Sequence, residues 1–483
     1  MKHTEKATLA DGRQVEYVVD PDKTMEGGMK QVYFTPDKSS VLCFFKDQSD
    51  RERRARLDAV IGKYNPTIQT NGEYWKRYYC WPTAIIQSPG LGVMCPTYPR
   101  NFFFNDGPWK GKEKEGSWFS GKTGGGKPFR DLMPPAERGT WINYLSLCIK
   151  MARAVSRLHL AGLAHSDLSP RNILIDPSTG QSIIIDIDSL VVKGIFPPDV
   201  LGTPGYIAPE VLGTCHLPLR DPKRVHPWTG TDLHALAVLI YQYLLFRHPL
   251  KGPKVNSTKS AEEDDHLSLG EKALFIEHPT DHSNRPSDRD LGVTYDILGP
   301  KLVELFNQAF VDGLHAPNRR PIAAQWEDVL LKTWDQLLQC SNPACMQKWF
   351  VAPRKGPARC PFCKTNIPGQ VLKLNFKKEY RPGTWLADGE LVIFHGKTIM
   401  KWHVYDNIQP NDPTLTDADR AEIYADCQFH GGQWILINRK LQHMLSPSRT
   451  PVAPNSAVAL KAGAQFHLSG EPHGRIAEVE IIQ

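Results

Sequence analysis

The chain has 483 residues, a formal net charge of +6, and 41% hydrophobic, 10% aromatic and 23% charged residues. This length exceeds what one compact core holds, so we expect several domains, and the apolar content excludes a mainly disordered chain. The net charge is small for the length and the basic residues are scattered, so we do not expect nucleic-acid binding to be the main function.

Features that would direct the chain out of the cytoplasm or into a membrane are not found in its sequence. Residues 1–6 lack the apolar stretch of a secretory signal, and no run reaches the ~18 apolar residues that cross a bilayer. Six of the ten cysteines are dispersed, which indicates reduced thiols rather than a disulfide framework. We therefore expect a cytoplasmic protein.

The first hundred residues predict a small, mostly antiparallel sheet with one helix. Short β-prone runs alternate with turn residues there, and a charged segment at Ser49–Lys63 has helical character. The predicted strands are Gln14–Val19, Gln31–Phe34, Val41–Lys46, Ala84–Gln87 and Gly92–Pro96.

A helical region is predicted to follow. From Thr140 onward apolar residues recur at helical spacing, and such segments continue to about Leu338. Between the sheet and these helices, residues 105–139 are rich in Gly, Lys and Pro, which predicts an exposed insertion.

Three motifs in this region indicate phosphoryl transfer. They are His165–Leu174 (HSDLSPRNIL), Ile185–Asp188 (IDID) and Gly202–Glu210 (GTPGYIAPE). Phosphoryl transfer needs a carboxylate beside the attacking hydroxyl and oxygen ligands for magnesium, and Asp167, Asn172 and Asp186 supply these groups. The motifs resemble the catalytic core of protein kinases, and of bacterial eukaryotic-like Ser/Thr kinases in particular.

The resemblance implies a role for each matching residue. Asp167 accepts or orients the substrate hydroxyl proton, and Asn172 and Asp186 hold Mg²⁺ or Mn²⁺. Thr203 bonds to Asp167 and positions the substrate together with Arg171. The segment that contains Thr203 favours a protein substrate over a small molecule.

The resemblance also implies a nucleotide site in the first lobe. Gly27 and Gly28 belong to the glycine-rich loop, Val32 covers the adenine, and Lys46 at the end of a strand clamps the ATP phosphates. The adenine-binding connection lies near Met94 and Cys95. The carboxylate that pairs with Lys46 stays open between Glu52 and Asp58.

Several positions depart from the kinase pattern. The first and third glycines of the loop fall on Met25 and Lys30, and the family's Gly after the magnesium Asp is Asp188. In the catalytic loop, Ser166 and Ser169 replace the usual Arg and Lys. An inactive pseudokinase scaffold that binds nucleotide and partner proteins therefore remains the alternative to an active enzyme.

Two cysteine pairs separated by fourteen residues predict a tetrahedral zinc site in a zinc ribbon. The cysteines are Cys340, Cys345, Cys360 and Cys363. Four free surface thiols are the other interpretation. From 371 onward, strand-like segments punctuated by turn residues predict an all-β, sandwich-like interaction domain, faintly similar to forkhead-associated domains.

The predicted fold class is α+β: a two-lobed protein-kinase fold followed by a zinc ribbon and an all-β domain. The predicted domains are 1–98 (first lobe), 99–335 (second lobe), 336–370 (ribbon) and 371–483 (β domain). The expected reaction is ATP-dependent phosphorylation of Ser/Thr on proteins, including the chain itself, with structural zinc. The combination resembles the kinase of tellurite-resistance-associated systems, which implies a PP2C-type phosphatase and a von Willebrand factor A protein as partners, and neither nucleic acid nor membrane.

Overall fold

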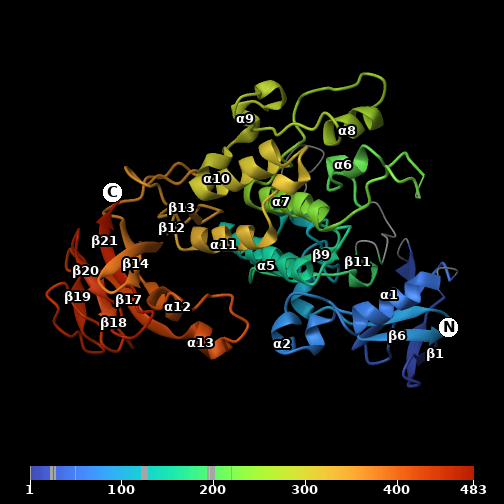
Figure 1. Ribbon diagram of the computed structural model, residues 1–483, viewed down its shortest axis with the longest axis horizontal. Coiled ribbons are helices and arrows are strands. Elements are labelled where there is room, and N and C mark those ends of the chain that lie inside the picture. Colours follow the sequence, from blue (N-terminus) through green and yellow to red (C-terminus); the bar gives the residue numbers. More distant parts are fainter. Residues whose placement is uncertain are drawn as a thin grey trace. The chain divides into compact units, whose positions relative to one another are not determined.

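The chain forms two compact units (Figure 1). The computed structural model describes residues 2–21, 25–26, 29–48, 51–120, 129–192, 195, 202–218 and 220–483. The first unit comprises residues 1–139, 143–294 and 304–327, and the second comprises 140–142, 295–303 and 328–483. Within the described ranges, no helix is long and apolar enough to span a membrane.

A seven-stranded antiparallel sheet opens the first unit, in the order β2-β1-β6-β7-β5-β4-β3. Its strands are β1 (His3–Leu9), β2 (Gln14–Val19), β3 (Met25–Glu26), β4 (Lys30–Phe34), β5 (Ser40–Phe45), β6 (Ala84–Ser88) and β7 (Gly92–Pro96). The five predicted strands are all present. β1 was missed because it is largely polar, with only Ala7 and Leu9 buried against the sheet.

The strands of this sheet have two differently packed faces because side chains alternate along a strand. On β5, Leu42 and Phe44 pack with β1, β2 and β6 in one cluster. Phe45 faces the other way, against Leu57 of helix α1 (Arg51–Ile61). Because of this alternation, only every second residue of β5 can reach the face of the sheet that packs against α1.

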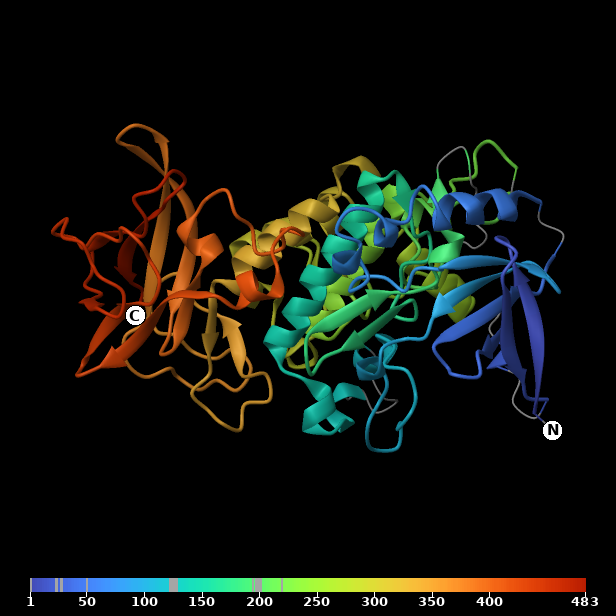
Figure 2. The same cartoon turned by 90° about the horizontal axis from the view of Figure 1, so that it is seen from below.

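A helical region follows the sheet in Figure 2. Its helices are α2 (Gly72–Trp75), α3 (Ser117–Ser120), α4 (Pro135–Arg138), α5 (Trp141–Leu160), α6 (Pro209–Leu212), α7 (Thr229–Leu245), α8 (Ala261–Leu269), α9 (Asp288–Leu291), α10 (Pro300–Asn307) and α11 (Ala323–Trp334). The predicted apolar face of α5 is buried at Leu145, Ala152 and Val155. Helix α7 is buried along nearly its whole length, as its apolar sequence predicts.

Two short two-stranded sheets complete this unit. They are formed by β9 (Ile173–Asp176) with β10 (Gln181–Ile184), and by β8 (Leu163–Ala164) with β11 (Val191–Val192), while a 3₁₀ turn, η4, spans Ile187–Ser189. Asp167 and Asn172 therefore lie on the loop between β8 and β9, and Asp186 lies on the loop between β10 and β11.

The segment 105–139 is more buried than its composition predicts. The side chain of Lys114 is 1% exposed and forms ion pairs with Glu137 at 2.6 Å and Asp176 at 3.5 Å. Phe119 and Arg130 are also buried. A charged Lys can be buried when carboxylates surround it. These residues of the segment are therefore buried, in contrast to the predicted exposed insertion.

The second unit contains two four-stranded sheets that share one core. One sheet has the order β15-β14-β21-β20 and the other β16-β17-β18-β19. The strands are β14 (Leu372–Arg381), β15 (Thr384–Ile393), β16 (Lys397–Met400), β17 (Ile423–His430), β18 (Gln433–Asn438), β19 (Ala457–Ala459), β20 (Gln465–His467) and β21 (Ile476–Ile481). Two short helices, α12 (Lys401–Val404) and α13 (Asp417–Ala421), connect β16 to β17.

The cysteine-bearing segment packs against this β region. It contains β12 (Leu337–Gln339) and β13 (Trp349–Val351), which pair in antiparallel fashion. Its Cys340, Cys345 and Cys360 share a buried cluster with Val371, Val392 and Ile482. The side-chain amide of Gln483 donates to the carbonyls of Ile367 (2.8 Å) and Gly369 (2.6 Å). The two parts therefore form one packed body.

Candidate active site

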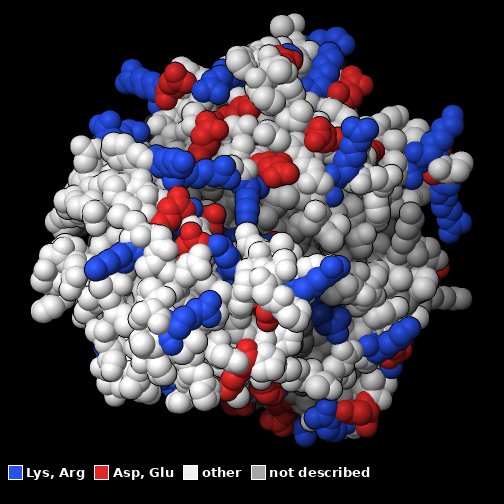
Figure 3. All heavy atoms as spheres, turned by 60° about the vertical axis from the view of Figure 1, so that its left-hand side comes forward, with Lys and Arg blue, Asp and Glu red and all other residues white. Residues whose placement is uncertain are grey.

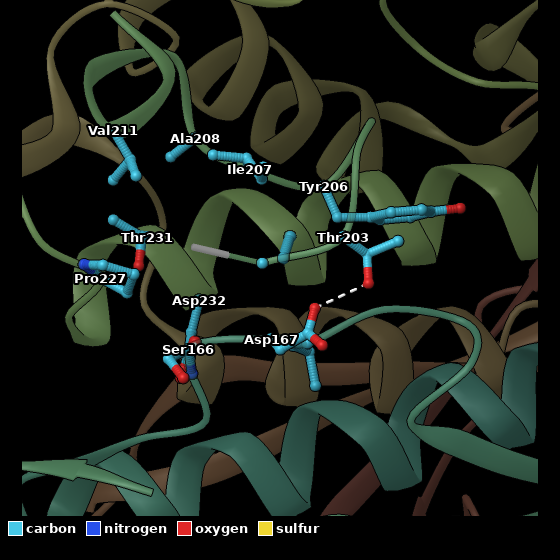
Figure 4. Close-up of a pocket in the computed structure, with 13 residues that line it drawn as sticks. Ser166, Asp167, Thr203, Tyr206, Ile207, Ala208, Val211, Pro227, Thr231 and Asp232 are labelled. Carbon is cyan, nitrogen blue, oxygen red and sulfur yellow. Dashed lines mark hydrogen bonds between the residues drawn. The ribbon is translucent and has the colours of Figure 1, made fainter. Parts of the chain in front are cut away.

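The backbone of the loop 165–172 is anchored by hydrogen bonds to Asp232, a buried residue of α7. The backbone amides of His165 and Ser166 donate to the Asp232 carboxylate at 2.7 and 3.1 Å, and His159 Nε2 lies 3.1 Å from the same group. Figure 4 shows Ser166 directly beside Asp232. A carboxylate that accepts two backbone N–H groups fixes the loop backbone, so the side chains that follow it have defined positions.

Asp167 lies at the centre of this loop and is hydrogen-bonded on both carboxylate oxygens. Thr203 Oγ1 donates to Oδ1 at 2.7 Å, the contact drawn in Figure 4, and Asn172 Nδ2 donates to Oδ2 at 3.0 Å. Asn172 Nδ2 also donates to the Asp167 carbonyl at 2.8 Å. Asp167, Asn172 and Thr203 are thus brought together, and the Asn172 amide oxygen is left as a potential metal ligand.

Gly202 makes the approach of Thr203 to Asp167 possible. Its φ of 114° lies in a region that favours glycine, and a Cβ there would lie 3.3 Å from the Ser166 carbonyl oxygen and 3.2 Å from Ile207. Further along the segment, Glu210 forms a bidentate ion pair with the buried Arg320, at 2.8 and 2.7 Å. This pair ties the segment to the helical region.

A cavity of about 400 Å³ lies between the sheet and the motif loops. Val32, Val41, Val93 and Ile185 are among its apolar lining residues, and Cys43, Cys80 and Cys95 also line it. Its charged lining residues are Lys30, Glu113, Asp186 and Asp188. The volume is within the range of small-molecule sites, and an apolar wall beside the charged group of Lys30, Asp186 and Asp188 suits a ligand with one flat apolar part and one anionic part.

Lys30 bridges the two aspartates of the IDID motif. Its Nζ lies 2.6 Å from Asp186 Oδ1 and 2.7 Å from Asp188 Oδ1, and its side chain is 16% exposed. Burial lowers the pKa of Lys30, but the two carboxylates more than compensate, so its pKa lies above its ordinary value. The amine is therefore a permanent cation at the charged end of the cavity.

The backbone of the IDID motif turns sharply at Asp186. This residue has a left-handed conformation with φ 60°, and Asp188 lies in the 3₁₀ turn η4. Burial raises the pKa of Asp188, and its Oδ2 has no hydrogen-bond partner among the described residues.

Of the other residues predicted to bind the nucleotide, Val32 and Cys95 line the cavity. Met94 packs on the opposite face of the sheet, and its carbonyl accepts from the Thr83 amide at 2.8 Å. Lys46 follows β5 and has an exposed side chain. Gly27 and Gly28 lie outside the described residues.

Helix α1 presents arginines, not a carboxylate, on its buried face. Arg53 and Arg56 are 4% and 2% exposed. Both candidate carboxylates are exposed, and Asp58 forms an ion pair with Arg54 at 3.2 Å. The carboxylates on the cavity lysine thus come from the IDID motif.

The remaining catalytic-loop positions are a buried serine and an exposed arginine. Ser169 is fully buried, whereas Arg171 points to solvent beside Asn172. Arg171 is therefore accessible to a substrate that approaches Asp167.

Residues 141–307 match the family model of the protein kinase domain. The chain is also similar to Ser/Thr-protein kinases over parts of their lengths. It is 30% identical over 146 residues to the Ser/Thr-protein kinase PknD of Chlamydia felis, covering 26% of this chain and 14% of PknD. It is 29% identical over 182 residues to oca2 of Schizosaccharomyces pombe, covering 36% of this chain and 24% of oca2.

A third relative is the Ser/Thr-protein kinase PknA of Mycobacterium tuberculosis. It is 31% identical over 132 residues, which cover 26% of this chain and 28% of PknA. The chain thus spans less than a third of the length of each of these relatives. The match to the protein kinase domain includes Asp167, Asn172, Asp186 and Thr203.

The four clustered cysteines converge in the second unit. Their Sγ atoms all lie within 4.8 Å of one another, with 3.5 Å between Cys340 and Cys363 and 3.8 Å between Cys345 and Cys360. Four sulfurs about 2.3 Å from a tetrahedral Zn²⁺ stand about 3.8 Å apart, so the donor set and spacing are compatible with a metal.

Sequence reasoning missed two charged residues of the cavity. Lys30 was noted only as a replacement for a glycine, although strand alternation on β5 was a readable signal that Lys46 and Cys43 face opposite ways. Glu113 was missed because it belongs to the insertion, whose contribution to the cavity no motif announces.

Proposed function

We propose that the chain is a protein kinase that transfers the γ-phosphate of ATP to Ser and Thr hydroxyls of protein substrates and of itself. The observation that carries the proposal is the position of Asp167, which accepts hydrogen bonds from Thr203 and Asn172 in a loop whose backbone is anchored by Asp232. The match to the protein kinase domain supports it.

In this reaction Asp167 receives the proton of the substrate hydroxyl. The hydroxyl oxygen bonds to the γ-phosphorus while the bond from that phosphorus to the β,γ-bridging oxygen breaks, and ADP leaves with the electron pair. Thr203 and Asn172 occupy one lone pair on each Asp167 oxygen, which orients the carboxylate and leaves capacity to accept the proton.

Asn172 and Asp186 fit the role of metal ligands. The Asn172 amide oxygen and the second carboxylate oxygen of Asp186 are hard donors, which Mg²⁺ and Mn²⁺ prefer, and the Asp186 side chain is 44% exposed. When bound, such a metal neutralises charge that develops on the phosphate oxygens.

A protein substrate follows from the segment 202–210. The hydrogen bond from Thr203 to Asp167 and the ion pair between Glu210 and Arg320 fix this segment, so a peptide can bind along it beside Asp167. The exposed Arg171 is placed to contact the substrate. Ser169 is buried, so it does not take the role of the usual lysine.

A catalytically inactive scaffold is the second candidate. It is favoured by the pairing of Lys30 with both aspartates, since Asp186 is then engaged by a cation rather than by a metal.

Phosphate incorporation from γ-labelled ATP decides between the two. We expect label in the native chain and in a basic acceptor protein, and a loss of about 10²–10⁴-fold in Asp167→Asn, as for removal of a general base. Asp186→Asn should lose label as well. Asp265→Asn, at an exposed helix position, is the matched control.

Phosphoamino-acid analysis should find phosphoserine and phosphothreonine. A native chain that binds ATP but transfers no label with Mg²⁺ or Mn²⁺ would establish the scaffold instead.

For the cysteine cluster we propose structural zinc. One zinc per chain is expected by elemental analysis, and Cys345→Ser should lose the metal while Cys215→Ser keeps it. Since the cluster shares its buried core with Val371 and Val392, zinc loss should also lower the melting temperature of the β region. Metal-free protein with an unchanged melting temperature would favour the free-thiol interpretation.

The β region is proposed to be a protein-interaction domain in a cytoplasmic enzyme. By resemblance, a PP2C-type phosphatase and a von Willebrand factor A protein are its proposed partners, which co-purification with each protein can test. Nucleic acid is not proposed, because Lys and Arg are interspersed with Asp and Glu on the face drawn in Figure 3.

A further inference from the structure

The strand expected to supply the phosphate-binding lysine does not direct one into the cavity. Val41 and Cys43 of β5 line the cavity, so the two-residue period of a strand assigns the next inward position to Phe45. Phe45 is buried against α1, and Lys46 has the opposite parity and an exposed side chain.

The neighbouring strand supplies a lysine at the same place. Lys30, the first residue of β4, pairs with Phe45 in the sheet register. Its Nζ lies 5.5 Å from the Phe45 ring centroid and reaches the end of the cavity where Asp186 lies. An ammonium from β4 therefore occupies the region that a lysine at position 45 would serve.

Asp188 is built to hold this lysine. The carboxylate side chain is 5% exposed, and its only described ionic partner is Lys30. Burying an uncompensated carboxylate is strongly unfavourable, so the replacement of the family's Gly by Asp at this position makes sense only beside a buried cation.

Lys30 also retains capacity for a ligand. An ammonium has three N–H donors, and two of them are directed at Asp186 Oδ1 and Asp188 Oδ1. No third partner of this ammonium is found among the described residues, and since Lys30 lines the cavity, one donor remains for an anionic group there.

We propose that Lys30 is the residue that binds the nucleotide phosphates, and that Asp188 is its positioning residue in place of a carboxylate on α1. The proposal rests on the proposed kinase function for the identity of the ligand. It assigns to Lys30 the role that the sequence motif implies for Lys46.

Nucleotide binding and phosphate transfer, measured on the full chain, test this together. In Lys30→Met we expect the affinity for Mg-ATP to fall at least about tenfold while the affinity for adenosine stays within about twofold, because only the phosphates lose a charge-assisted contact. Phosphate transfer should fall at least about 100-fold in kcat/KM. Lys30→Arg should recover part of both.

The rival assignment and the folding effect are tested by further variants. Lys46→Met is expected to lose far less than Lys30→Met, and Lys63→Met, an exposed lysine after α1, is the matched control. Lys30→Met leaves Asp188 without its cation, so the double variant Lys30→Met/Asp188→Asn restores charge balance and should still fail to prefer ATP over adenosine.

Asp188→Asn tests the positioning role. We expect the ATP-to-adenosine affinity ratio and kcat/KM to fall several-fold, with adenosine binding unchanged. An equal loss of ATP and adenosine affinity in Lys30→Met, or a larger loss in Lys46→Met, would overturn the proposal. A native chain that transfers no phosphate but prefers ATP in a Lys30-dependent manner would refute the proposed function and leave this inference standing.

Discussion

The loop 165–172 and the charged end of the cavity differ in how sequence position relates to spatial position. In the loop, Asp167 and Asn172 are five residues apart and contact each other, and the backbone of the same loop is fixed by Asp232. At the charged end, the cation comes from β4, 156 residues before its partner Asp186. A local motif describes the first region, whereas the second is formed by residues distant in sequence.

The reason is geometric. A loop that must place several groups in fixed relation needs particular residues at particular spacings. A lysine has only to bring a point charge to one location at the end of a flexible stem, and any adjacent strand can do so. Variants can break this comparison or sharpen it.

The largest expected effect is in the segment that faces the loop. Arg320→Ala leaves Glu210 without its bidentate partner, and we expect the free energy of unfolding to fall by about 3 kcal/mol. Urea denaturation measures it, with Arg319→Ala, an exposed neighbour, as the control. Equal midpoints for the two variants would mean that the segment is held in another way.

Asp232→Asn should have the next largest effect. An amide accepts only one of the two backbone N–H groups and points its own N–H₂ at the other, so we expect a loss of about 2 kcal/mol in stability. Asp265→Asn should change little. Full phosphate transfer in Asp232→Asn, measured below its melting temperature, would contradict the view that this loop needs an anchored backbone.

A smaller effect is expected from Thr203→Val. This change preserves the shape of the side chain but removes one hydrogen bond to a charged group, which corresponds to a roughly tenfold fall in kcat. Thr203→Ser should restore most of the rate. If valine and serine behave alike in steady-state assays, the contact does not orient Asp167.

The smallest effect is expected from a change on α1, which tests whether a carboxylate of this helix contributes to the charged end of the cavity. Asp58→Asn on α1 breaks only an exposed pair with Arg54, worth about 0.3–0.5 kcal/mol, and ATP affinity should stay within about twofold. A tenfold loss of ATP affinity by calorimetry would instead assign to α1 the carboxylate role that we give to Asp188.

Sequence reasoning was most successful where chemistry imposes local spacing. The contact of Thr203 with Asp167 and the convergence of the four cysteines were predicted. The strand β1 was missed because it is largely polar, and the burial of Lys114 was missed because its partner Asp176 is distant in sequence. The motif that indicates Lys46 does not include Lys30, and only the alternation of side chains on β5 points to a lysine from another strand.

The packing of the cysteine segment on the β sheets determines how the chain can be divided for experiments. A fragment that begins at 371 would expose Val371, Val392 and Ile482 to water, and Gln483 would lose the carbonyls of 367 and 369. Such a fragment should aggregate or bind unspecifically through this new apolar surface. Partner screens with the β region therefore require a fragment that starts before Leu337 and retains all four cysteines.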